Sequence, residues 1–509
     1  MKYWLGLDIG TGGSRALLVD EDGGVAGGVT APHEDMRMPQ PLWAEQDPEN
    51  WWRAAQQAIR GVLQETRVGS DDVAAVGLSG QMHGLVLLGQ SNEVLRPAII
   101  WCDQRCQDQV DWINATAGAA MVLEQTANPV LTGFTAPKLL WVRDHEPAVY
   151  EKVRHVLLPK DYIRWRLTGE FAGDVSDSSG TALFDVVKRR WAGPLVEKLG
   201  IERSILPAVF ESTELTGVIS EVVSERTGLK AGTPVVGGAG DQAASAVGNG
   251  IVEPGLVSAT IGTSGVVFSH LDEVAYDPRG RVHTFCHAVP GKWHVMGVTQ
   301  GAGLSLQWFR NQLAGDLVAE AGRRGVDPYE LITEEAASAP AGSEGLVWLP
   351  YLMGERTPHL DAQARGGWIG LTARHRRAHM ARAVIEGVSY SLKDCLEILK
   401  SLGVEATQVR ASGGGARSDF WRRVLAATLD LPIVTLESQE GSAYGAALLA
   451  MVGSGGFGSV EEACRTVIQE RSRVEPDSDW RLRYADGYKS FQQLYPALRP
   501  LFPGMSAGS

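Results

Sequence analysis

Two short segments of the chain pair a carboxylate with glycines, a combination suited to phosphate chemistry. Asp8 precedes Gly10-Thr11-Gly12-Gly13, and Asp241 follows Gly237-Gly238-Ala239-Gly240. A carboxylate at the end of a buried strand can hold a hydrated Mg²⁺, while the N–H groups of a glycine hairpin face a phosphate. Glycines permit this close approach because they carry no Cβ. Taken alone, the first segment fits an ordinary tight hairpin equally well.

Two further glycine turns extend the pattern. Gly262-Thr263-Ser264-Gly265 lies between two apolar runs, and Ser412-Gly413-Gly414-Gly415 separates an expected strand from an expected helix. Two glycine hairpins that face one cleft can hold the phosphates of one nucleotide between them. The third turn suits a nucleotide or plain packing of helix on sheet. Neither the dinucleotide-binding glycine pattern nor the P-loop pattern occurs, which argues against both of those folds.

Asp241 is open to two interpretations at this level. A carboxylate within hydrogen-bond reach of an alcohol can accept its proton as a new O–P bond forms. Asp is also a favoured helix N-cap, and a helix-forming run, 242–247, follows it. The residues alone leave the general base and the cap equally open.

The elements that must position these groups come in two similar sets. Residues 3–9 alternate between faces, turn at the first glycines and return at 16–19, which predicts a strand–turn–strand unit. Residues 256–268 repeat this layout in the second half of the chain, which indicates two related halves. Asp47 and Pro48 are typical of a helix start, and helices alternating with strands indicate an α/β fold.

Composition excludes several classes of protein. The chain has 509 residues and a formal charge of −13, which argues against a nucleic-acid-binding surface. No apolar run approaches the ~18 residues of a membrane helix, and the N-terminus has no signal-peptide pattern. Five cysteines are few and odd in number, so we expect a reduced, cytoplasmic protein. Met505–Ser509 is expected to be a frayed tail.

One segment resembles a metal site in its residue types. His283, Cys286 and His287, with His294 beyond them, could supply ligands. The alternation of residues 282–288 predicts a strand that puts His283 and His287 on one face and Cys286 on the other. A zinc site needs converging ligands, so we expect none here.

The glycine motifs, taken together, resemble those of a known superfamily. Asp8-Ile9-Gly10-Thr11, Gly262-Thr263-Ser264 and Ser412-Gly413-Gly414-Gly415 resemble the two phosphate loops and the adenosine motif of the actin, heat-shock chaperone and sugar-kinase ATPases. Residues 133–142 and 370–387 are similar to the two signatures of the FGGY carbohydrate kinases. The resemblance runs from about residue 3 to 500. It implies two RNase H-like α/β domains, 1–245 and 246–509, with an active cleft between them.

The resemblance also implies roles for individual residues, with ATP and Mg²⁺ as cofactors. Asp241 would be the catalytic base, and Asp8 would hold Mg²⁺ through water. The residues implied for the nucleotide are Gly10, Thr11, Gly12, Gly262, Thr263, Ser264, Gly303, Gln307, Gly413, Gly414 and Gly415.

Four segments (80–84, 101–105, 158–162 and 349–359) resemble the members of this family that phosphorylate D-xylulose. The residues implied for the sugar are Gln81, Met82, His83, Trp101, Asp103 and Gln242. A core position is the commoner case for an isolated histidine such as His83, and Trp101 fits a core equally well. Gln242 stands where some xylulose-phosphorylating members have Asn. We therefore expect a xylulose kinase that binds neither nucleic acid nor membrane, with a homodimer left open.

Rival interpretations remain at this level. The nearest is an FGGY kinase for another ketose or polyol, such as ribulose, gluconate or glycerol. A chaperone-like or actin-like ATPase is the rival from a different class, and turnover that does not depend on sugar would favour it.

Overall fold

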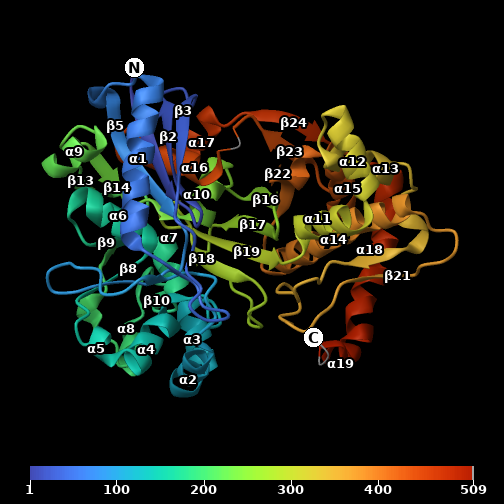
Figure 1. The fold of residues 1–509 in the computed structure, drawn as a ribbon, viewed down its shortest axis with the longest axis horizontal. Coiled ribbons are helices and arrows are strands. Elements are labelled where there is room, and N and C mark those ends of the chain that lie inside the picture. Colours follow the sequence, from blue (N-terminus) through green and yellow to red (C-terminus); the bar gives the residue numbers. More distant parts are fainter. Residues whose placement is uncertain (439, 507–509) are drawn as a thin grey trace.

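Two seven-stranded sheets form the frame of the molecule in the computed structural model, which describes residues 1–438 and 440–506 (Figure 1). The first sheet has the order β13-β14-β5-β1-β2-β3, and β15 also pairs with β5. Its strands are β1 (Tyr3–Ile9), β2 (Gly13–Asp20), β3 (Val25–Pro32), β5 (Val73–Gly80), β13 (Leu215–Val218), β14 (Pro234–Val236) and β15 (Ala239–Gly240).

The second sheet has the order β18-β19-β17-β16-β22-β23-β24. Its strands are β16 (Gly255–Ile261), β17 (Gly265–Leu271), β18 (His283–Cys286), β19 (Trp293–Thr299), β22 (Ala406–Ser412), β23 (Ile433–Leu436) and β24 (Glu470–Val474).

The two sheets share one topology, which confirms the predicted repeat. In each, an antiparallel hairpin (β1-β2 or β16-β17) pairs on its other side with a parallel strand, β5 or β22. The glycine turns connect the paired ends at Ile9–Ser14 and Ile261–Gly265. The two glycine turns that are expected to bind phosphate therefore lie at the same edge of equivalent sheets.

Helices cover both sheets, and α1 (Pro48–Thr66) begins as predicted. The Asp47 side chain caps it by accepting the Glu49 N–H at 3.0 Å, and Pro48 lies at its first turn. The other elements of the first half are α2 (Gln107–Ala117), α3 (Ala119–Thr126), α4 (Thr135–His145), α5 (Pro147–Tyr150), α6 (Pro159–Thr168), α7 (Val175–Ser178), α8 (Gly193–Lys198), α9 (Glu221–Thr227), β4 (Glu45–Gln46), β6 (Val86–Leu88), β7 (Ala98–Ile99), β8 (His155–Leu157), β9 (Ala172–Asp174), β10 (Phe184–Asp185), β11 (Arg190–Trp191) and β12 (Ala208–Phe210).

The helices of the second half pack mainly around the second sheet (Figure 1). The remaining elements there are α11 (Ala302–Leu313), α12 (Gly315–Arg324), α13 (Pro328–Ala337), α14 (Arg377–Ser401), α15 (Asp419–Leu429), α17 (Val460–Val467), α18 (Ser478–Leu498), α19 (Phe502–Ser506), β20 (Val347–Leu349) and β21 (Gly367–Ile369). The expected tail is helical as far as Ser506, which corrects that expectation for Met505 and Ser506, and 507–509 lie outside the described residues. In the described part of the chain, no helix combines the length and apolarity needed to cross a bilayer.

Two crossing helices, α10 (Asp241–Gly248) and α16 (Gly441–Gly453), connect the two sheets. Although α16 belongs to the second half, it packs on α10, β1 and β5. The packing is close enough to require glycine, because a Cβ on Gly445 would lie 1.8 Å from the Ala244 carbonyl oxygen. A Cβ on Gly6 would lie equally near the Ala443 oxygen. The predicted domain boundary after residue 245 falls inside α10 and stays a prediction.

Candidate active site

Asp8 and Asp241 come together because β5 lies between their strands. Ser79 of β5 pairs with Asp8 on one side and with Ala239 on the other, so Asp241 follows just beyond the same edge. The turn before it requires glycine, since Gly238 has a φ of +68° and a Cβ there would lie 2.1 Å from the Leu78 oxygen. The register thus brings both predicted carboxylates to one place.

The electrostatics of the two carboxylates are coupled. Burial, together with the negative charge of Asp8, raises the pKa of Asp241 to about 7. The pKa of Asp8 is also raised by burial, with the Ser79 hydroxyl and the Arg15 charge acting in the opposite direction. Gly240, not Asp241, is the N-cap of α10, which excludes the N-cap interpretation of Asp241. A carboxyl with a pKa near neutrality is suited to general-base catalysis.

Backbone and side-chain hydrogen bonds hold the turn between β1 and β2. The Gly10 N–H donates to the Gly13 oxygen at 3.0 Å, and the Gly12 oxygen accepts the His33 N–H at 2.9 Å. The Thr11 hydroxyl accepts from Trp101 Nε1 at 3.0 Å and donates to Gln81 Oε1 at 3.4 Å.

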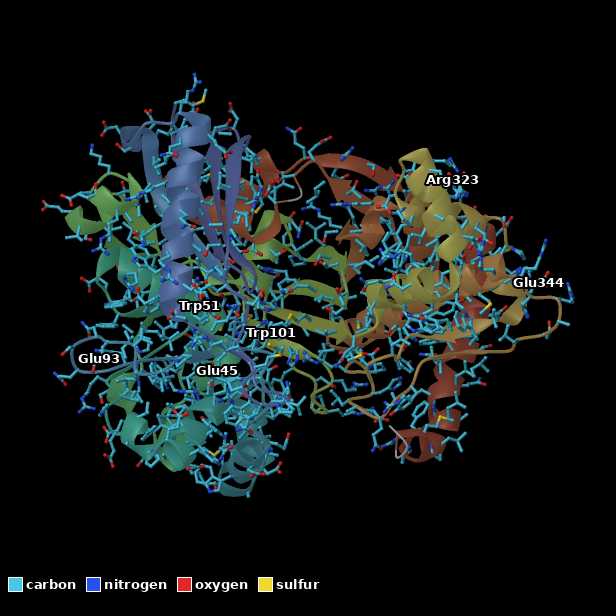
Figure 2. The ribbon with its side chains drawn as sticks, in the orientation of Figure 1. Glu45, Trp51, Glu93, Trp101, Arg323 and Glu344 are labelled. Atoms are coloured by element: carbon cyan, nitrogen blue, oxygen red, sulfur yellow. The ribbon has the colours of Figure 1, made fainter. Side chains whose placement is uncertain are left out.

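These bonds bear on two residues expected to contact sugar. Gln81 is buried and tied to this turn, while Trp101 is 43% exposed and labelled near the middle of the view in Figure 2. Both side chains therefore support the Gly10–Gly13 turn, and their contact with a sugar stays a prediction.

His83 is fixed on several sides. Its backbone has a φ of +69°, and its carbonyl accepts from Lys138 Nζ at 2.9 Å and Thr135 Oγ1 at 3.1 Å. The ring stacks on Phe134, and its Nδ1 lies 2.7 Å from the Gly180 oxygen. Because a carbonyl only accepts, Nδ1 carries the hydrogen and Nε2 is left as an acceptor. Burial, aided by the Lys138 charge, lowers the pKa of His83 to about 3, so the ring is neutral.

Met82 lies next to the catalytic candidate. Its side chain is buried, and its Cγ lies 2.9 Å from the position a Cβ on Gly240 would take. The Gln242 side chain lies against the Asp241 carboxylate and opposes the rise in its pKa. Both residues thus lie beside Asp241, and their contact with a sugar stays a prediction.

Asp103 does not join this group. It is fully buried, and its oxygens accept from the Ala44 N–H at 2.6 Å and from Arg105 at 2.7–3.0 Å. This arrangement gives Asp103 a role in holding the loop, and its sugar contact stays a prediction that the geometry does not favour.

A cavity of about 560 Å³ brings the second set of predicted residues together. Six of them line it: Gly262, Thr263, Gly303, Gln307, Gly414 and Gly415. The Gly303 N–H donates to the Gly262 oxygen at 2.7 Å, and a Cβ on Gly303 would lie 2.4 Å from that oxygen. The sequence analysis did not single out the other lining residues, which are Ile261, Leu306, Asp327, Tyr329, Glu330, Thr333, Arg417, Ser418 and Trp421.

Gly413 lines an adjoining cavity of about 750 Å³, which shares Gly414 and Arg417 with the first. Arg422 and Arg471 add positive charge to its wall. Ser264 lines neither cavity, but its carbonyl accepts the Gly262 N–H at 3.0 Å and closes the turn.

Lys138, which the sequence analysis did not single out, supports the loop that contains His83. It is fully buried, burial lowers its pKa to about 7, and it binds the carbonyls of both His83 and Gly133. A single lysine within the apolar run 136–142 was the signal available.

Two of the three histidines that resembled a metal site, His283 and His287, have hydrogen-bond partners in the protein. His283 Nδ1 lies 3.0 Å from Asn128 Oδ1, and His287 Nε2 lies 2.9 Å from the Ile251 oxygen. Among the described residues, the one cluster with metal-ligand spacing is a different one, formed by Asp161, Asp174 and Asp177.

Repeated sheets joined by crossing helices, with glycine turns and a carboxylate pair at their edges, define an actin/hexokinase-type ATPase fold. Family models of the FGGY carbohydrate kinases match residues 3–248 for the N-terminal domain and 257–454 for the C-terminal domain. The chain belongs to the FGGY family of carbohydrate kinases, as the motifs indicated, and membership implies the use of ATP.

Similar proteins cover nearly the whole length of the chain. The xylulose kinase of Escherichia coli K12 is 39% identical over 98% of this chain and 99% of its own length. That of Bacillus subtilis is 36% identical over 98% of both chains. The structure of ligand-bound xylulose kinase from Lactobacillus acidophilus has a TM-score of 0.92 at 28% identity, covering 99% of this chain and 100% of that one.

Proposed function

We propose that this chain transfers the γ-phosphoryl group of ATP to the terminal hydroxyl of D-xylulose, with Asp241 as the general base. The observation that carries the proposal is the pair formed by Asp241 and Asp8, in which one carboxyl has a pKa of about 7. The full-length relatives named xylulose kinase support the choice of sugar.

Asp8 is suited to bind Mg²⁺ through a water molecule. Its Oδ1 is shielded from solvent and has no hydrogen-bond partner among the described residues, so it is free to accept from a metal-bound water. The Gly10–Gly13 turn beside it offers backbone N–H groups to a phosphate. When bound, Mg²⁺ would offset the negative charge of the phosphates.

The residues around Asp241 have distinct tasks in the proposed reaction. The ionised Asp241 carboxylate accepts the proton of the sugar hydroxyl as the O–P bond forms and the bond to ADP breaks. His83 Nε2 accepts a hydrogen bond from another sugar hydroxyl, and Met82 packs on the carbon chain. Gly262, Thr263 and Gly303 hold the nucleotide from the second sheet.

Kinases for related sugars are the second candidate. The structure of gluconate kinase from Lactobacillus acidophilus has a TM-score of 0.91 at 28% identity, nearly the values of the xylulose kinase from the same organism. Overall shape therefore does not discriminate between a ketose and a sugar acid.

A cytoplasmic location and a homodimer form part of the proposal. All five cysteines are free thiols, which suits a reducing compartment. Gel filtration with light scattering would measure the oligomeric state, and a monomeric mass would exclude the dimer.

The test measures ADP release by the wild type and Asp241→Asn on D-xylulose, D-ribulose, gluconate and glycerol. We expect the highest kcat/KM with D-xylulose and a loss of about 10³-fold or more in Asp241→Asn. Asp394→Asn is the matched control, because Asp394 is another buried carboxyl, has a pKa of about 6 and binds Tyr488 away from the cleft. Preference for another sugar would refute the substrate, and an active Asp241→Asn would refute the base.

A further inference from the structure

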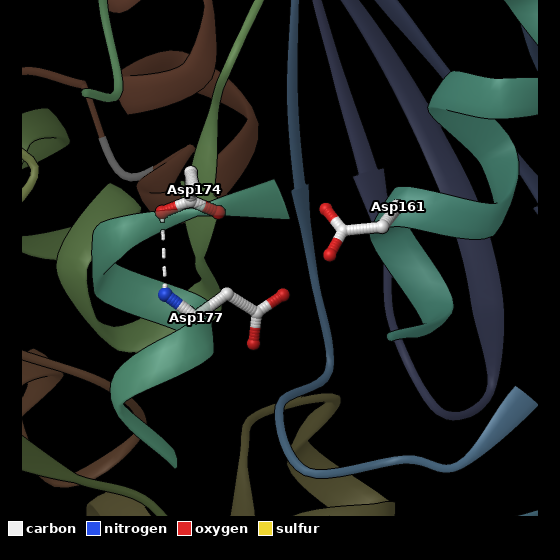
Figure 3. Close-up of side chains that lie close together, drawn as sticks. All are labelled: Asp161, Asp174 and Asp177. Carbon is white, nitrogen blue, oxygen red and sulfur yellow. Dashed lines mark hydrogen bonds between the residues drawn. The ribbon is translucent and has the colours of Figure 1, made fainter. Parts of the chain in front are cut away.

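A buried cluster of charged side chains packs around the turn that leads to Asp241. Lys160, Asp161 and Arg164 come from α6, and Asp174 and Asp177 come from the start of α7. All five are at most 2% exposed, and Figure 3 shows the carboxyls of Asp161 and Asp177 facing each other across the space between the two helices. The proposed reaction uses none of them.

The cluster already contains its own cation. Lys160 Nζ lies 2.5 Å from Asp161 Oδ1, 2.7 Å from Asp174 Oδ2 and 3.8 Å from Asp177 Oδ2. The ammonium group thus occupies the place among the three carboxyls where a metal would bind. The cluster is therefore better explained by what it holds than by a missing ion.

The charged cluster holds both ends of the glycine turn, residues 237–240. Asp174 Oδ1 accepts the Ser176 hydroxyl at 2.6 Å, and Ser176 Oγ in turn accepts the Gly240 N–H at 3.1 Å. At the other end, Arg164 Nη1 donates to the Gly237 oxygen at 2.6 Å. The Asp174 carboxylate fixes the direction of the hydroxyl, so a lone pair of Ser176 Oγ points to the backbone N–H that directly precedes Asp241.

Buried ion pairs support a fixed cluster. Neither oxygen of Asp177 has a hydrogen-bond partner among the described residues, and burial holds the pKa of this carboxyl well above its usual range. The ion pairs of the cluster join Lys160 to Asp161 and Asp174, and Arg164 to Asp161. These buried ion pairs anchor the turn next to Asp241.

We propose that Ser176, oriented by Asp174, is a positioning residue that holds the Asp241 carboxylate in its catalytic place. The inference rests on the proposed function of Asp241 as base. Three of the four residues before Asp241 are glycines, which do not restrict their own backbone, so the position of Asp241 depends on anchors outside the turn. The segment that contains Ser176 continues to Gly180, whose carbonyl holds His83, so the base and the sugar contact share one support.

The test is a double-mutant cycle of Ser176→Ala and Asp241→Asn. We expect Ser176→Ala to lower kcat by about 10- to 100-fold with both KM values within about twofold, because small misplacement of a catalytic group reduces rate more than binding. In the Asp241→Asn background the same change should cost less than about twofold, since the positioned base is absent. Single-turnover measurements at high enzyme concentration give the residual rates.

Two further variants complete the design. Asp174→Asn keeps the side-chain shape but weakens the orientation of the hydroxyl, and should show the same split between kcat and KM. Ser389→Ala removes a buried hydroxyl that binds the Ile385 oxygen in α14, and should leave kcat unchanged. An equal loss from Ser176→Ala in both backgrounds, or no loss of kcat, would overturn the inference. Full activity of Asp241→Asn alone would instead overturn the proposed base.

Discussion

Replacing Asp241 with Asn should stabilise the folded protein at alkaline pH while removing most of its activity. The pKa of this carboxyl rises from 3.8 to about 7 on folding. Between these values the folded state binds more protons than the unfolded state, so the free energy of unfolding falls as pH rises. A shift of about three pKa units, at about 1.4 kcal/mol per unit, lowers the free energy of unfolding by about 4 kcal/mol. This loss of stability is absent below pH 4 and complete above pH 7.

Asn never ionises, so the variant escapes this penalty. Urea denaturation of wild type and Asp241→Asn at pH 8 and pH 5 measures the difference. We expect a higher urea midpoint for the variant at pH 8, corresponding to a gain of up to about 4 kcal/mol in the free energy of unfolding, and a clearly smaller gain at pH 5. Asp486→Asn, which changes an exposed carboxylate paired with Lys489, should shift neither midpoint. A variant that is less stable at pH 8, or equally shifted at both pH values, would refute the reasoning about burial.

The remaining predictions concern catalysis. Since Asp241 must be ionised to act and has a pKa of about 7 in the free protein, kcat/KM should rise about tenfold from pH 6 to pH 8, whereas a flat profile would contradict the base. Gly303→Ala should raise KM for ATP about tenfold or more in initial-rate assays, because its Cβ would lie 2.4 Å from the Gly262 oxygen, whereas Gly315→Ala meets open space and should not. His83→Ala should raise KM for the sugar about tenfold with KM for ATP unchanged, and the reverse pattern would place His83 outside the sugar site.

The architecture could be predicted from local patterns in the sequence. Alternation at residues 3–19 and 256–268 predicted two equivalent hairpins, and the cap at Asp47 predicted the start of α1, because both depend on near neighbours in the chain. The glycine turns likewise indicated that the backbone makes close contacts there. Six of the residues assigned to the nucleotide line one cavity.

The partners of the site residues were not accessible in this way. Gln81 and Trp101 bind Thr11, and Asp103 binds Arg105 in the interior, because strand pairing and loop packing decide which polar groups meet. No spacing rule connects Ser176 with Gly240.

The sequence by itself thus determined the class of fold, the paired glycine turns and the two carboxylates, since residue type and short-range periodicity encode them. Tertiary structure alone decided that β5 brings Asp8 and Asp241 together, which nitrogen of His83 is the acceptor, and how a buried charged cluster holds the turn before the base. These properties depend on burial and on contacts between distant segments, which exist only once the chain has folded.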